Sequence, residues 1–209
     1  LPILAGLGCG QKEAAQTSAG AAADSVAFAA VGALEDEAAQ LEALTRFVKE
    51  RPKSAQAGRA YIGLIDLATK LDPASVPAHL KKVLASDFPS AMPYNAIGWN
   101  LAEAGEHLEM AVPILEKGVA IARAAGDSTE LASILDSEAW ARYKKGDHAV
   151  AVERMEEAYA LVGPGDDEYD KHMALIYDAA GMGEKAKPLI IGLLSHMENP
   201  ALRESLHQI

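Results

Sequence analysis

The sequence predicts an all-α protein, a right-handed α-solenoid of antiparallel helix hairpins with about nine or ten helices. Half of the residues are hydrophobic but only 5% are aromatic. This balance is typical of closely packed helices and differs from the β-branched and aromatic composition of strands. Apolar residues recur every three or four positions, and short Gly- or Pro-containing segments interrupt them. Short turns between amphipathic helices favour hairpins that stack on their neighbours.

The first helical segments lie between residues 33 and 90. The apolar pattern begins at Ala33 and stops near Pro52, because proline cannot continue a helix and restrains the residue before it. Further breaks fall at Asp72-Pro73 and Phe88-Pro89. We interpret residues 33–90 as degenerate helical hairpins at the start of a solenoid domain that spans 33–209.

Clearer self-similarity runs over residues 91–198. Alignment on Gly105, Gly146 and Gly181 superposes three helix-turn-helix units, with spacings of 41 and 35 residues. Small residues recur inside these units, where paired helices approach closely. The matching positions are Tyr94, Ile97, Gly98, Ala111, Leu115 and Gly118 in the first unit, Ala149, Met155 and Ala158 in the second, and Ala174, Tyr177 and Ala186 in the third.

These units resemble the tetratricopeptide repeat (TPR), a helical hairpin of about 34 residues. The segment 146–152 is similar to the turn and the early alanine of that family. The resemblance implies a TPR-like solenoid that serves as a protein-protein interaction scaffold. It also implies that the first helix of each repeat lines a concave groove, with its second, fifth, ninth, twelfth and thirteenth positions facing inward.

The two tryptophans, Trp99 and Trp140, are 41 residues apart, the same offset as the first two turn glycines. Both therefore take the ninth position of a first helix. Aromatic and polar side chains in a groove suit an extended peptide or a partner's helix. In the alternative, both tryptophans are buried between stacked repeats. The groove that the register implies consists of Asn95, Trp99, Glu103, Asp136, Trp140, Tyr143, Lys144, Lys171 and Leu175.

The start of the chain resembles the end of a bacterial lipoprotein signal peptide. An apolar run closes with Gly8 before Cys9, although Gly6 stands where leucine is usual. The resemblance implies that residues 1–8 are a signal remnant and that Cys9 carries a membrane-anchoring lipid. Residues 9–32 would form a flexible, Ala-rich tether. Gly10 favours the outer over the inner membrane; the alternative is a short hydrophobic helix with a chance cysteine.

The sequence does not predict catalysis, a cofactor, a metal or a small-molecule substrate. The formal net charge is −11, which argues against nucleic acid, since phosphate binding needs clustered basic residues. Glu168 and His172 could share a helix face, but a metal site needs a third ligand, so a solvated pair is the favoured interpretation. HExxH, Walker, GxGxxG and GxSxG motifs are absent from the sequence.

The sequence thus favours a non-catalytic scaffold, lipid-anchored in the bacterial cell envelope. It would face the periplasm or the cell surface and bind protein partners within a larger envelope complex. Two alternatives stay open: a helical accessory arm of a larger thioredoxin-like envelope redox protein, and a cytoplasmic TPR adaptor.

Overall fold

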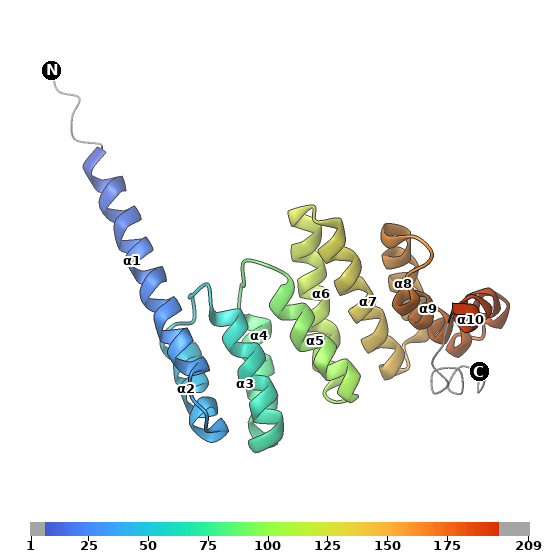
Figure 1. The fold of residues 1–209 in the computed structure, drawn as a ribbon, viewed down its shortest axis with the longest axis horizontal. Coiled ribbons are helices and arrows are strands. Elements are labelled where there is room, and N and C mark those ends of the chain that lie inside the picture. Colours follow the sequence, from blue (N-terminus) through green and yellow to red (C-terminus); the bar gives the residue numbers. More distant parts are fainter. Residues whose placement is uncertain (1–6, 197–209) are drawn as a thin grey trace. The chain divides into compact units, whose positions relative to one another are not determined.

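The computed structural model describes the backbone of residues 7–196 and the side chains of residues 20–195. Within this part it holds ten α-helices, one short 3-10 helix and no strand (Figure 1). The predicted all-α class is therefore confirmed. The chain divides into two units, Leu1–Pro89 and Ser90–Ile209. This division lies beside the point where the sequence changes from degenerate to clearer repeats.

The first unit packs its helices in chain order. The Phe28 and Phe47 rings join α1 to α2, with centroids 5.6 Å apart, and Arg51 donates to Asp24 at 2.5 Å. The helix α3 then packs on α2, and α4 packs on α3. The elements are α1 (Leu7–Gly32), α2 (Glu37–Glu50), α3 (Ala57–Leu71), η1 (Pro73–Ser75) and α4 (Val76–Ala85).

Residues 9–32, which the sequence predicted as a flexible tether, lie within the continuous helix α1. Its many alanines have the highest intrinsic helix propensity, which does not depend on an apolar stripe. Residues 1–6 lie outside the described part of the chain, as does the side chain of Cys9, so the signal remnant and the lipid anchor stay predictions. Among the described helices, α1 included, none has the length and apolarity that a bilayer crossing requires.

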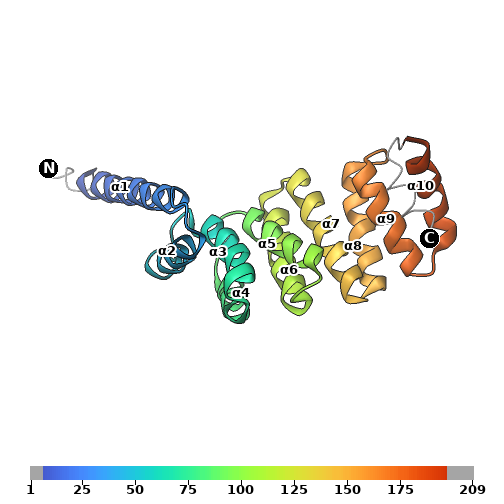
Figure 2. The ribbon, with the colours of Figure 1, turned by 60° about the horizontal axis from the view of Figure 1, so that its bottom comes forward.

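The second unit consists of three helical hairpins (Figure 2). Its odd-numbered helices pack against one another, α5 on α7 and α7 on α9, and so form one layer. The even-numbered helices α6, α8 and α10 pack against them as the second arms of the hairpins. The elements are α5 (Met92–Ala104), α6 (Leu108–Ala125), α7 (Ser128–Lys145), α8 (His148–Val162), α9 (Asp167–Ala179) and α10 (Gly183–His196).

The three turn glycines used to align the repeats all have a left-handed backbone. Their φ angles are +69° at Gly105, +91° at Gly146 and +73° at Gly181. Side chains with a Cβ atom are strained in this region, whereas glycine is not. Each turn therefore ends the first helix of a hairpin and reverses the chain within a few residues.

Two further glycines permit close helix packing inside the first hairpin. A Cβ atom at Gly98 would overlap the Leu115 side chain, and one at Gly118 would meet Ile134 and lie 2.9 Å from the Cβ of Tyr94. All three of these neighbouring side chains are fully buried. Small residues at these positions thus set the distance between α5, α6 and α7.

Candidate functional site

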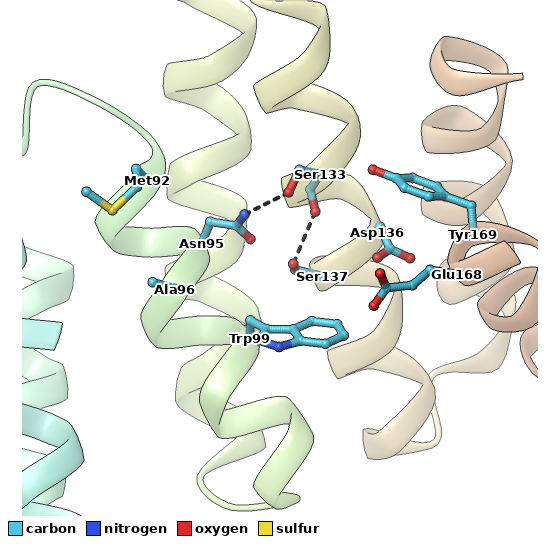
Figure 3. Close-up of a pocket in the computed structure, with 9 residues that line it drawn as sticks. All are labelled: Met92, Asn95, Ala96, Trp99, Ser133, Asp136, Ser137, Glu168 and Tyr169. Carbon is cyan, nitrogen blue, oxygen red and sulfur yellow. Dashed lines mark hydrogen bonds between the residues drawn. The ribbon is translucent and has the colours of Figure 1, made fainter. Parts of the chain in front are cut away.

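A pocket of about 300 Å³ opens on the layer formed by α5, α7 and α9 (Figure 3). Three of the residues predicted for the groove line it. Each of the three helices contributes side chains to its wall. The lining residues are Met92, Asn95, Ala96, Trp99, Ser133, Asp136, Ser137, Glu168 and Tyr169.

The repeat register explains lining residues that the sequence analysis did not name. Met92, Ser133 and Glu168 are related by the same offsets of 41 and 35 residues as the turn glycines. They hold the second position of each repeat, which the TPR resemblance assigns to the groove. The signal was therefore present in the sequence, although the predicted groove omitted these three positions.

Hydrogen bonds fix the pocket wall. The Asn95 Nδ2 donates to the Ser133 Oγ at 3.1 Å, and the Ser137 Oγ donates to the Ser133 carbonyl at 3.1 Å. The N-cap residue Asp166 accepts from the backbone N–H groups of Glu168 and Tyr169. This cap holds the first turn of α9 and so places both side chains at the pocket.

His172 is buried between the two tryptophans. Its exposed fraction is 1%, and its ring centroid lies 4.5 Å from that of Trp140 and 5.7 Å from that of Trp99. The His172 Nδ1 lies 2.8 Å from the Asp136 Oδ1, and because a carboxylate only accepts, Nδ1 donates. The predicted solvated pair of Glu168 and His172 is therefore wrong, since His172 points into the layer and pairs with another helix.

The two tryptophans divide between the predicted groove and the alternative of buried rings. Trp99 is partly exposed and lines the pocket, whereas Trp140 is 8% exposed. The Trp140 Nε1 donates to the Glu103 Oε1 at 2.5 Å. The Tyr143 ring stacks on Trp140 at 4.9 Å, and the Lys144 Nζ lies 5.1 Å from the Trp140 centroid.

The predicted groove residues thus fall into three sets. Asn95, Trp99 and Asp136 line the pocket. The second set consists of Trp140 and the three predicted residues that contact its ring, Glu103, Tyr143 and Lys144. Lys171 and Leu175 are half-buried on α9 but are not part of the pocket wall.

The pocket wall carries charge of one sign. Asp136 and Glu168 contribute carboxylates, and no lysine or arginine lines the pocket. Burial and the neighbouring carboxylates of Asp136, Asp166 and Glu168 raise the pKa of Tyr169 to about 12. Within the described residues, no group of three His, Cys, Asp or Glu side chains is arranged to hold a metal ion.

Comparison with solved structures identifies a fold neighbour. The fold is similar to that of MamA. Two MamA crystal structures each have a TM-score of 0.54 and 19% identity to this chain and cover 77% of it. The aligned part spans 82% of one MamA chain and 88% of the other. MamA is a TPR-like solenoid, so the predicted fold class is confirmed. No family model matches the sequence, and no curated protein matches it.

Proposed function

We propose that this chain is a non-catalytic interaction scaffold that binds a segment of a protein partner in the pocket of its α5–α7–α9 layer. The observation that carries the proposal is the partly exposed Trp99 ring in that pocket. An exposed aromatic ring held by a rigid helical layer is typical of binding hot spots. The TPR-like fold shared with MamA is compatible with this role.

The polar groups of the pocket support a binding role over a catalytic one. Asn95 and Ser137 hydrogen-bond to Ser133, while Asp136 pairs with the buried His172. These bonds join or brace helices, so they position the wall. We therefore assign these side chains to recognition of a partner and not to a reaction.

Affinity capture with matched variants tests this function. A tagged chain is used to capture partners from native extract, and the partner is then purified and its Kd measured by calorimetry. Trp99→Ala should raise the Kd about tenfold or more, as expected for an aromatic hot spot. Glu153→Ala, on the exposed surface of α8, should leave it unchanged. Equal Kd values for both variants would contradict the proposed site.

We also propose that a lipid on Cys9 anchors the scaffold in the bacterial cell envelope, with the outer membrane favoured. The support is the apolar segment that ends in Gly8-Cys9-Gly10. In cells grown with an alkyne fatty acid, the natural protein should be labelled and sediment with membranes, whereas Cys9→Ser should be unlabelled. An unlabelled natural protein in the soluble fraction would contradict the anchor and favour a cytoplasmic adaptor.

A further inference from the structure

The carboxylates of Asp136 and Glu168 point into the same space, between the Trp99 and Tyr169 rings (Figure 3). Two like charges that converge in a pocket repel each other unless a cation lies between them. Within the part of the chain whose side chains are described, neither carboxylate pairs with a lysine or arginine. The pocket therefore has the charge and the aromatic wall that suit a cationic group.

We infer that this pocket binds an arginine side chain of the partner protein, an inference that rests on the scaffold function proposed above. A guanidinium is planar, stacks on an aromatic face and donates up to five N–H bonds in a fixed fork. The Trp99 ring offers such a face at the pocket wall. Lysine offers a compact, strongly hydrated charge and cannot form the same planar contact.

Unused acceptors in the pocket match the donors of a guanidinium. The Asn95 Oδ1 is buried and has no hydrogen-bond partner among the described residues. The hydrogen bond from His172 uses one oxygen of Asp136, which leaves the other as an acceptor. Glu168 is exposed at the rim, where it can pair with an arriving cation. A buried acceptor without a donor is costly, so a ligand N–H would relieve a cost that the free pocket carries.

The negative charge of the pocket disfavours an acidic partner segment. The whole chain has a formal net charge of −11, and two of its carboxylates line the pocket, where no lysine or arginine is present. An acidic segment would bring a further negative charge toward the two pocket carboxylates and would be repelled. A basic segment is attracted, and its association should weaken as salt screens the charges.

Nuclear magnetic resonance of the full chain tests the inference with a defined probe. The probe is N-acetyl-arginine N-methylamide, and its matched control is the citrulline analogue, which has nearly the same shape but no charge. The chain has only two tryptophans, so the two indole N–H signals are assigned with Trp99→Phe. We expect saturable shifts of the Trp99 indole and of the Glu168 amide with the arginine probe, and at least about tenfold weaker binding of the citrulline probe.

A variant pair controls for charge alone. Glu168→Gln removes the rim carboxylate from the pocket, whereas Asp167→Asn removes a neighbouring charge from the same helical turn outside the pocket. Glu168→Gln should weaken arginine binding about threefold to tenfold, the range between an exposed and a partly buried ion pair. Asp167→Asn should change it by less than about twofold.

The outcomes separate this inference from the scaffold function. Equal binding of the arginine and citrulline probes, or equal effects of the two variants, overturns the arginine pocket. Native partner capture that still depends on Trp99 would then leave the scaffold function standing. If arginine binds selectively but Trp99→Ala does not affect partner capture, the pocket is supported and the proposed function fails.

Discussion

Trp99 and Trp140 occupy the same repeat position but have different surroundings. One residue that contributes to the difference is His172 of the third repeat, which lies at the register position of Ala96 and Ser137. Its larger ring fills the space beside Trp140, with centroids 4.5 Å apart. Trp140 thereby becomes a packing residue, while Trp99 remains at the pocket wall. Equivalent positions in a repeat protein therefore need not share a role.

Replacement of each tryptophan by alanine should separate these roles. Trp140→Ala removes a buried ring together with its stacking contacts and its hydrogen bond to Glu103. We therefore expect a loss of about 3 kcal/mol in the free energy of unfolding. Trp99→Ala should cost less than about half of this, because its ring is partly exposed. Urea unfolding followed by circular dichroism measures both. A larger loss for Trp99→Ala would contradict the assignment.

The candidate site could be predicted in part from the sequence. The repeat offsets placed Asn95, Trp99 and Asp136 on one face, because a fixed register repeats the direction of each side chain. The burial of His172 could not be predicted in this way. It depends on a hydrogen bond to Asp136, which lies 36 residues earlier on another helix, and no local pattern reveals that contact.

Gly98 offers a test of close packing at a single residue. Gly98→Ala would press a Cβ atom against the Leu115 side chain, and this overpacking should outweigh the gain in helix propensity and destabilise the chain by about 1–2 kcal/mol. Gly192→Ala on α10 is the matched control, since nothing lies within 4 Å of its added Cβ. It should stabilise the chain by about 0.5–1 kcal/mol. Equal midpoints in urea would contradict the packing argument.

At the scale of elements, a buried carboxylate joins three helices of the second unit. Glu138 on α7 is 1% exposed and accepts from Arg142 at 2.7 Å and from Arg154 of α8 at 3.1 Å. Arg142 also reaches Glu116 of α6 at 2.5 Å. A buried charge held by two guanidinium groups fixes the relative positions of α6, α7 and α8.

Glu138→Gln keeps the shape of this side chain and removes its charge. It leaves two arginines facing a neutral group, so we expect a loss of about 2–3 kcal/mol. Glu157→Gln is the control, because Glu157 also pairs with arginines but is 32% exposed. Its loss should stay below about 1 kcal/mol. The comparison uses thermal and urea unfolding by circular dichroism, and similar losses would show that burial does not decide the strength of these pairs.

Elements differ in how well the sequence predicts them. The hairpins of the second unit follow from apolar periodicity and turn glycines, two signals that agree. Helix α1 has no clear apolar stripe, so its alanine-rich segment was predicted as a tether. Intrinsic propensity alone favours a helix there, and packing of Phe28 on Phe47 adds to it near the C-terminal end.

At the scale of the whole molecule, alkaline pH should destabilise the fold. Burial and the hydrogen bond to Asp170 raise the pKa of Tyr159 from 10.0 to about 12, and the pKa of Tyr169 is similarly raised. The folded state then holds these protons more tightly than the unfolded state. The associated stability is fully present below pH 10 and is lost as the pH rises toward about 12.

Urea unfolding by circular dichroism between pH 8 and pH 11.5 measures this loss. Tyr159→Phe removes one of the tyrosines whose pKa is raised in the folded state, so its stability should fall less steeply with pH than that of the natural chain. Tyr143→Phe is the control for loss of a hydroxyl group alone, because phenylalanine keeps the ring that stacks on Trp140. Parallel slopes for the natural chain and Tyr159→Phe would contradict the assignment.

The placement of the tryptophans also determines what intrinsic fluorescence can report. Both lie in the second unit, and the first unit has none. The two rings also contact His172 of the third hairpin. Tryptophan emission thus reports on the α5–α7–α9 layer and does not report on α1 to α4. If the denaturation curve of tryptophan emission differs from that of far-ultraviolet circular dichroism, the two units unfold separately.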